Sequence, residues 1–301
     1  MLTHKNYTLA ALCALTSFTG WTMSDALLKL VRQENIPQGQ IMIISALSGM
    51  AVIFLFCLLR GNLRRLQPHK WRGLIALGCC QWLAFVCWLA ALPRLPLTNM
   101  YVVAFLTPMV VACLAALFLH EHPGWKRGTA IAVGFAGVVT AVNPLGLMQR
   151  EGAWIPYAIV FASMLGTATQ MLMLRAVGRK ESSECMSFYP RLAIALAGVG
   201  YCATTGVVAM KAWVFLALCA SGALGGLGWV LMAKAYKNAP AAAVAPFHYS
   251  QMITGALLGY LIWSDVPSPY LMGGTLVIVA SGVYLVRHER RASRMAPVDQ
   301  V

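Results

Sequence analysis

The sequence predicts an all-α membrane protein of ten transmembrane helices, arranged as two inverted five-helix repeats with both termini in the cytoplasm. Three observations support this fold class. Of the 301 residues, 59% are hydrophobic and 11% are charged, whereas an ordinary soluble domain carries about 25% charged residues. Apolar runs of roughly 18 or more residues, each long enough to cross a hydrocarbon core of about 30 Å, recur along the chain. Small and charged residues of the first half also recur in the second half.

The apolar runs define ten spans, which are separated by short breaks rich in proline, glycine and charge. No break is long enough to hold a soluble domain. The nine cysteines fall mostly inside the runs without metal-ligand spacing, so we expect them to pack as small apolar residues. The predicted spans cover residues 7–31, 39–59, 72–92, 96–119, 126–145, 153–175, 186–208, 212–234, 240–263 and 269–287.

The distribution of basic residues predicts the orientation of the spans. If the N-terminus is cytoplasmic, 17 of the 23 lysines and arginines lie on the cytoplasmic side, 5 lie on the opposite side, and Arg191 falls within a span. Cytoplasmic loops of membrane proteins carry such an excess. The net charge of +14 is therefore attributed to topology and to contact with anionic lipid, and no nucleic-acid partner is expected.

The two halves of the chain repeat one another at nearly constant offsets of 144 to 146 residues. Because each unit has five spans, an odd number, the second copy must be inserted in the opposite sense. We expect a first repeat at 7–145, a second at 153–288 and a basic cytoplasmic tail at 289–301. The matched pairs are Gly20 with Gly166, Lys29 with Arg175, Ser45 with Arg191, Gly78 with Gly222, Ala91 with Ala235, Pro96 with Pro240 and Glu121 with Asp265.

The end of each repeat resembles the EamA-type drug/metabolite transporter superfamily. The residues that carry the resemblance are YVVAFLTPMVVACLAALFLHEHPGWKRGTAIAVGFAGVVTAV and VAPFHYSQMITGALLGYLIWSDVPSPYLMGGTLVIVASGVYLV. In that family, each half closes with a span ending in an acidic residue, a proline-containing turn and a glycine-containing helix. Here the second acid is Asp265 in place of the usual glutamate. An arginine common early in the second helix is replaced by Ser45, whereas its counterpart Arg191 is present.

The resemblance implies a secondary transporter, not an enzyme, with no bound cofactor. The expected activity is export of a small polar or zwitterionic, amino-acid-like metabolite, such as an opine-type metallophore, across the bacterial inner membrane by alternating access. The alternative is import of a nucleoside-like or flavin metabolite, S-adenosylmethionine or riboflavin. A membrane-embedded enzyme or lipid-handling protein would need a cluster of catalytic acids or nucleophiles, which the sequence lacks. Expected partners are the substrate, membrane lipids and a coupling proton or counter-substrate, and the chain is expected to be a monomer.

Asp25 is the only one of the nine acidic residues that lies well inside a predicted span. A charge at bilayer depth costs at least about 2.5 kcal/mol, so an intramembrane acid is a candidate functional residue. Asp25 could take up a coupling proton or meet a substrate ammonium group. The alternative is a local ion pair with Lys29, four residues later on the same helical face.

Arg191 lies about one turn inside the seventh predicted span. Its planar guanidinium suits a substrate carboxylate, which it can bind through two parallel hydrogen bonds. The alternative is an arginine whose side chain extends to the membrane interface.

Polar and aromatic residues in the middle of the spans predict a central pocket lined by spans 1, 3, 4, 6, 8 and 9, because polar groups in hydrocarbon need a partner or a wet cavity. His248 titrates near neutral pH or else packs as a core residue. No metal site is expected, since HEH at 120–122 lacks the HExxH spacing. The candidate substrate-binding residues are Trp21, Asp25, Gln81, Trp82, Tyr101, Phe105, Gln170, Arg191, Trp229, His248, Tyr249 and Gln251.

Overall fold

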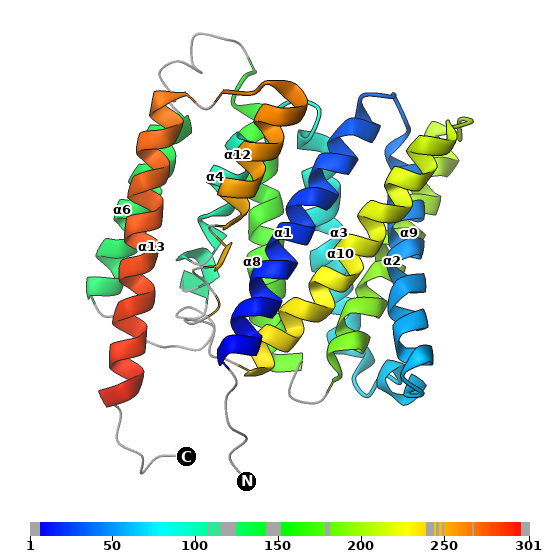
Figure 1. Cartoon of the computed structure of the whole chain (residues 1–301), viewed down its shortest axis with the longest axis horizontal. Coiled ribbons are helices and arrows are strands. Elements are labelled where there is room, and N and C mark those ends of the chain that lie inside the picture. Colours follow the sequence, from blue (N-terminus) through cyan, green and yellow to red (C-terminus); the bar gives the residue numbers. More distant parts are fainter. Residues whose placement is uncertain are drawn as a thin grey trace.

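The protein is a bundle of helices that lie side by side along a common direction (Figure 1). The computed structural model describes residues 7–107, 109–111, 113–114, 125–142, 152–177, 181–238, 244, 247–248, 250–266 and 268–295. These residues contain no strand. The elements are α1 (Tyr7–Arg32), α2 (Gln38–Leu59), the 3-10 helix η1 (Leu63–Leu66), α3 (Trp71–Ala91), α4 (Leu97–Ala104), α6 (Trp125–Val142), α8 (Ile155–Val177), α9 (Ser183–Thr205), α10 (Ala212–Asn238), α12 (Ser250–Trp263) and α13 (Pro269–Met295).

Four helices among the described residues are long and apolar enough to cross a membrane: Gln38–Leu59, Trp71–Ala91, Ile155–Leu174 and Ala212–Tyr236. Helices α1 and α9 have similar lengths, 26 and 23 residues, but are less apolar because they bury polar side chains inside the bundle. These include Ser17, Ser24, Glu184 and Arg191. The count of ten spans therefore stays a prediction.

The most extensive helix contacts are preserved when the two halves are exchanged. The repeat pairs α1 with α8, α2 with α9, α3 with α10, α4 with α12 and α6 with α13. The contact between α1 and α10 thus corresponds to the contact between α8 and α3, and the contact between α1 and α12 corresponds to that between α8 and α4. The contact of α2 with α10 likewise becomes that of α9 with α3, while α2–α9, α4–α12 and α6–α13 map onto themselves. Every one of these contacts is present, so the halves are arranged about an approximate twofold axis.

Two hydrogen bonds show the same symmetry at the level of single atoms. Ser17 Oγ of α1 donates to the carbonyl oxygen of Gly228 of α10 at 2.7 Å, and Ser163 Oγ of α8 donates to that of Ala84 of α3 at 2.7 Å. Ser163 follows Ser17 by 146 residues and Gly228 follows Ala84 by 144, which are the offsets of the sequence repeat. The repeated sequence therefore forms repeated contacts.

The second half runs in the opposite sense to the first. Helices α1 and α3 run in the same direction (Figure 1). Helix α8 is antiparallel to α3, because Gln81 contacts Gln170 and Ala84 contacts Ser163. Helix α8 is therefore antiparallel to α1, its counterpart in the repeat. The first turns of α1 and the last turns of α13 lie at the same end of the bundle (Figure 1).

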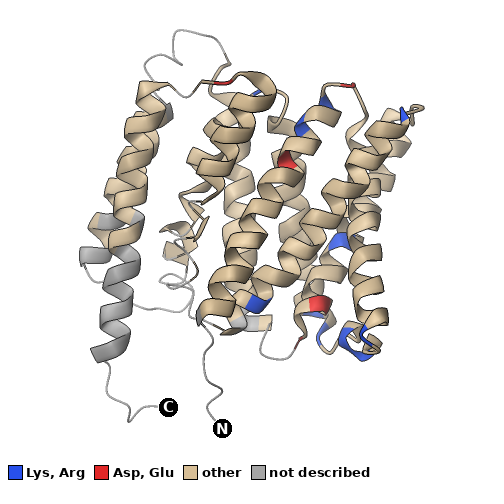
Figure 2. Ribbon diagram, in the orientation of Figure 1, with Lys and Arg blue, Asp and Glu red and all other residues tan. Residues whose placement is uncertain are grey.

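Most charged residues lie at the two ends of the bundle (Figure 2). We call the end that holds Lys29, Glu34 and Asp265 the Lys29 end, and the end that holds η1 the η1 end. Basic residues are more numerous around η1 than at the Lys29 end. The charge bias thus predicts that the η1 end faces the cytoplasm.

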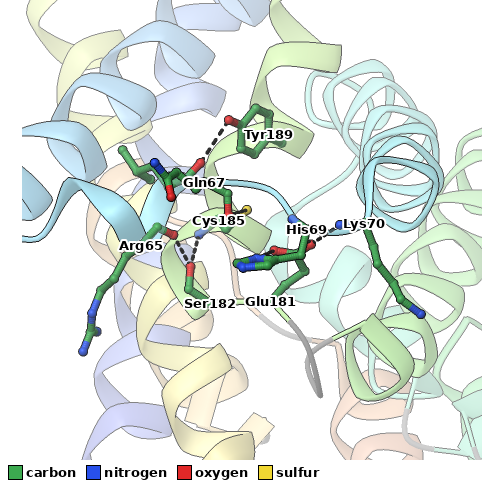
Figure 3. A network of polar contacts seen from close by, with 9 residues as sticks. Arg65, Gln67, His69, Lys70, Glu181, Ser182, Cys185 and Tyr189 are labelled. Atoms are coloured by element: carbon green, nitrogen blue, oxygen red, sulfur yellow. Dashed lines mark hydrogen bonds and ion pairs between the residues drawn. The ribbon is translucent and has the colours of Figure 1, made fainter.

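At the η1 end, the loop before α3 is bound to the loop before α9 (Figure 3). The buried carboxylate of Glu181 accepts hydrogen bonds from the backbone N–H groups of His69, at 2.7 Å, and Lys70, at 2.5 Å. Ser182 accepts a hydrogen bond from the first turn of α9 and donates one to the backbone oxygen of Arg65. These contacts join the first half of the chain to the second half.

The corresponding loops are bound to one another at the Lys29 end. The side-chain amide of Gln40 donates to the backbone oxygen of Val208 at 2.8 Å and accepts from its backbone N–H at 3.0 Å. Lys211 forms an ion pair with Glu34 at 2.8 Å. Helices α2 and α9 are therefore held together at both ends of the bundle.

We predict that Glu181→Gln lowers the melting temperature of the purified protein in detergent at pH 7. Burial raises the pKa of Glu181, but the backbone hydrogen bonds from Lys70 and His69 outweigh it and hold that pKa below its ordinary value of 4.5. Hydrogen bonds to a charged group contribute about 1.5–3 kcal/mol. The contribution of the carboxylate is complete above pH 4.5 and is lost as the pH falls through the lowered pKa.

The difference in melting temperature between Glu181→Gln and the unchanged protein should therefore shrink below pH 4.5. Glu34→Gln is the matched control, because the Glu34–Lys211 pair is partly exposed and such pairs contribute about 0–1 kcal/mol. Equal losses in the two variants, or a loss that does not depend on pH, would contradict the prediction.

Candidate functional site

A cavity of about 170 Å³ lies between the two halves of the bundle. Residues of α1, α3, α4, α8 and α10, together with His248 and Gln251 at the start of α12, line it. These elements correspond to the predicted spans 1, 3, 4, 6, 8 and 9. Helices α2 and α9 were not among the predicted lining spans, but α2 contributes Ser45 and α9 contributes Arg191, which was a predicted substrate-binding residue.

The structure brings most of the predicted site residues together around this one cavity. They come from both halves of the chain and from positions as far apart as 21 and 251. The residues that line it are Trp21, Asp25, Gln81, Tyr101, Gln170, Arg191, Trp229, His248 and Gln251.

Trp82 does not line the cavity, which corrects its inclusion in the predicted site. Its side chain is exposed on the outer face of α3. The cavity-facing stripe of α3 consists instead of Gln81, Ala84, Phe85 and Trp88, which follow the i, i+3, i+4, i+7 spacing of one helical face. Trp82 lies about 100° around the helix from Gln81. The same spacing was the available signal for Trp88, which the prediction missed.

Phe105 is fully buried but lies behind the lining, with its ring edge-on to His248 at a centroid distance of 5.7 Å. It supports the cavity wall without facing the cavity. Tyr249, Glu121 and the HEH sequence at 120–122 lie outside the residues that the structure describes.

The carboxylate of Asp25 is held by two uncharged hydrogen-bond donors. Trp88 Nε1 donates to Oδ1 at 2.9 Å, and the Tyr101 hydroxyl donates to Oδ2 at 2.7 Å. Asp25 forms no ion pair with any residue that the structure describes. A carboxylate in such a setting can accept a proton or a cationic group of a ligand.

Lys29 pairs with Asp265 and not with Asp25, so this structure does not contain the local ion pair that was the alternative interpretation of Asp25. Its Nζ lies 3.4 Å from Asp265 Oδ2 and 4.4 Å from the centre of the Trp263 ring. The reversal of the chain after α12 brings Asp265 to this position: Ser264 adopts a left-handed conformation with φ of 56°, and the Asp265 N–H donates to the oxygen of Gly259 at 3.1 Å.

Arg191 reaches the cavity from α9 through a gap between α2 and α10. A Cβ atom on Gly49 would lie 2.6 Å from Arg191 Nη1, and one on Gly225 would lie 3.2 Å from Nη2. The missing side chains of these glycines provide the room for the guanidinium. Arg191 is only 5% exposed and forms no hydrogen bond or ion pair within the described part of the chain. It therefore does not extend to the interface.

Aromatic rings pack around the part of the cavity formed by α1, α10 and the start of α12. The rings of Trp21 and Trp229 are 4.7 Å apart, and His248 stacks on Phe18 at 4.7 Å with an interplanar angle of 8°. A Cβ atom on Gly228 would lie 2.3 Å from Trp21 Nε1, so this glycine makes room for the indole. These faces can stack against an unsaturated ligand.

Uncharged polar groups complete the lining. Gln170 Nε2 donates to Gln81 Oε1 at 3.1 Å, and the hydroxyls of Ser24 and Ser221 lie 3.1 Å apart. Gln170 Oε1 is buried without a hydrogen-bond partner. The cavity therefore combines one acid, one arginine, amide groups and aromatic faces, which is a lining suited to a small polar ligand.

Comparison with known proteins agrees with this architecture. The chain matches the EamA-like transporter family twice, at residues 8–143 and 154–287. An S-adenosylmethionine uptake transporter of Rickettsia bellii is 25% identical over 239 residues, which are 77% of each chain. A riboflavin transporter of Rhizobium johnstonii is 25% identical over 82% of this chain and 80% of its own. The pseudopaline exporter CntI of Pseudomonas aeruginosa is 25% identical over 93% of this chain and 96% of its own.

A solved crystal structure has the same fold, with a TM-score of 0.67 and 20% sequence identity over 95% of this chain and 99% of that one. Together, the two family matches cover nearly the whole chain, and the helices carry long apolar segments. The chain belongs to the EamA-like transporter family and is a multi-pass membrane protein.

Proposed function

We propose that the protein is a secondary transporter that exports a small zwitterionic, amino-acid-like metabolite across the bacterial inner membrane. The observation that carries this proposal is that Asp25 and Arg191 line one cavity, each without an ion-pair partner among the described residues. A zwitterion offers the complementary charge to each of them. The two inverted halves would alternate access to the cavity, with the η1 end and both termini in the cytoplasm.

Arg191 is the proposed carboxylate site. Its guanidinium is nearly excluded from solvent and has no hydrogen-bond acceptor among the described residues. An uncompensated charge in a protein interior costs several kcal/mol, and a bidentate carboxylate is the ligand that best offsets this cost. A Cβ atom on Gly225 would lie 3.2 Å from Arg191 Nη2 and 3.8 Å from Ser24 Oγ, so the guanidinium and α1 both border the space beside this glycine.

Asp25 is the proposed coupling site. Trp88 and Tyr101 fix the orientation of its carboxylate but bring no positive charge. Because one carboxylate can be neutralised by a proton or by a substrate ammonium group, the two would compete at this residue. Such competition would link uptake of a proton from one side to release of the substrate there.

The relatives support more than one direction of transport. The pseudopaline exporter aligns over the largest share of the chain among these three relatives, which favours export of an opine-like zwitterion. The paired rings of Trp21 and Trp229 favour a second candidate, import of a nucleoside-like or flavin metabolite, because their faces could stack on a heterocycle. Each chain encloses its own cavity between its two halves, so we propose that the protein acts as a monomer.

We predict that Arg191→Gln weakens binding of zwitterionic ligands by about 10- to 100-fold, which corresponds to the roughly 1.5–3 kcal/mol of a charged hydrogen bond. The measurement is the thermal shift of the purified protein with a panel of amino acids, opines, nucleosides and flavins. Arg94→Gln is the matched control, because Arg94 is exposed and, within the described part of the chain, donates a hydrogen bond to the backbone oxygen of Ala90 in α3. Undiminished binding by Arg191→Gln, or equal binding of ligands without a carboxylate, would contradict the carboxylate site.

We further predict that Asp25→Asn abolishes gradient-driven flux of the best ligand in proteoliposomes while the fold persists, and that it weakens binding of the zwitterion because the variant has no carboxylate for the ammonium group. The asparagine side chain keeps one oxygen that can accept a hydrogen bond from Trp88 or Tyr101, but it cannot take up or release a proton. Glu34→Gln serves as the control for removal of an acid far from the cavity. Unchanged flux in Asp25→Asn would exclude Asp25 from the coupling mechanism.

A further inference from the structure

Lys29 lies between two acids that compete for it. Asp265 at the end of α12 holds it in this structure, at 3.4 Å. Asp25 lies four residues earlier on α1, and residues so spaced are neighbours on a helix surface, with Cβ atoms about 5–6 Å apart. The long, flexible side chain of a lysine can therefore reach either carboxylate. The Lys29 side chain is only 10% exposed, so water offers it little alternative solvation.

The Lys29–Asp265 pair joins α1 to the turn after α12 at the Lys29 end of the bundle. Trp263 supports the pair, because its ring lies 4.4 Å from Lys29 Nζ. Tyr101, which binds Asp25, packs closely against the same helix: a Cβ atom on Gly255 of α12 would lie 2.6 Å from its ring. Asp25 and Asp265 thus both act on the contact between α1 and α12.

The α1–α12 contact is one of the contacts that close the bundle at the Lys29 end. Helices α2 and α9 are bound together at this end through Gln40 and Val208. Helices α4 and α8 are joined by the Asn99 side-chain amide, which donates to the Tyr157 hydroxyl at 2.7 Å. An opening at this end that separates α1 from α12 is directly opposed by the Lys29–Asp265 pair.

We propose that Lys29 switches between Asp265 and Asp25, so that it closes the Lys29 end while Asp25 is protonated. While Asp25 carries the proton, Lys29 stays on Asp265 and holds α12 against α1. When Asp25 is a bare carboxylate, or when Lys29 displaces a substrate ammonium group from it, Lys29 moves to Asp25, Asp265 is released and this end opens. The inference rests on the proposed role of Asp25 and names Lys29 as the positioning residue that responds to its charge.

The groups that contact Asp25 are uncharged, which leaves Lys29 as the cation that responds to the charge of Asp25. Trp88 of α3 and Tyr101 of α4 contribute uncharged donors, and the cavity residues of α8 and α10 are uncharged. The other titratable or charged groups that line the cavity are Arg191 of α9 and His248 before α12. Lys29 is not a lining residue, but it follows Asp25 on α1 by a single helical turn.

The test measures how fast the cavity is reached from the Lys29 end, in the absence of substrate. The nine native cysteines are replaced, Ala104 on the cavity wall of α4 is changed to cysteine, and a membrane-impermeant thiol reagent is added to the side of oriented vesicles that exposes the Lys29 end. Asp25→Asn should slow labelling by about 5- to 150-fold, the usual range of coupling between sites. Lys29→Met should speed labelling, and in that variant Asp25→Asn should have no further effect. Lys29→Arg keeps a cation at this position and should therefore restore the effect of Asp25→Asn.

A charge exchange separates the switch from a purely structural ion pair. The double variant Lys29→Asp with Asp265→Lys restores a pair between α1 and α12 but leaves no cation for Asp25. If Lys29 is a switch, the exchanged protein should be labelled slowly, and Asp25→Asn should not change its labelling rate. If the ion pair is purely structural, Asp25→Asn should slow labelling of the exchanged protein as much as it slows labelling of the unexchanged protein. An unchanged labelling rate in Asp25→Asn would overturn the switch. Loss of zwitterion binding with the predicted labelling pattern would instead overturn only the proposed substrate.

Discussion

The cost of enclosing charge within an apolar bundle governs the arrangement of this protein. A charge buried without a partner costs several kcal/mol, and the chain places Asp25, Lys29 and Arg191 inside or beside the bundle interior. Lys29 is balanced by Asp265 and by the face of Trp263. Asp25 has only uncharged donors, and Arg191 has no protein partner at all among the described residues. The two charges left unbalanced are the two that face the cavity.

The repeat supplies a symmetric frame, and the charges break that symmetry. The equivalent bonds of Ser17 with Gly228 and of Ser163 with Ala84 hold each half against the other in the same way. At the positions equivalent to Asp25 and Arg191, the other half carries Met171 and Ser45. One half therefore contributes the acid and the other the arginine. A single ligand that touches both would bridge the two halves, which is the arrangement that an alternating-access carrier requires.

The sequence was sufficient to predict the helical class, the repeat and nine of the residues that line the cavity, because these follow from composition, offsets and helical periodicity. It was not sufficient for the partners of individual charges. Asp25 and Lys29 are neighbours on α1, yet the turn after α12 brings Asp265 to Lys29, and the sequence gives no sign of that approach. Arg191 near the end of a predicted span could have reached the interface. Its path inward depends on Gly49 and Gly225, which lie on two other helices.

The most direct test is an experimental structure of the protein with the zwitterion that stabilises it best. The account predicts ligand in the cavity between the two halves, with its carboxylate about 2.7–2.9 Å from the guanidinium nitrogens of Arg191, the range of charge-assisted hydrogen bonds. A ligand bound outside this cavity, or an Arg191 that pairs with a carboxylate of the protein while the ligand is present, would contradict it.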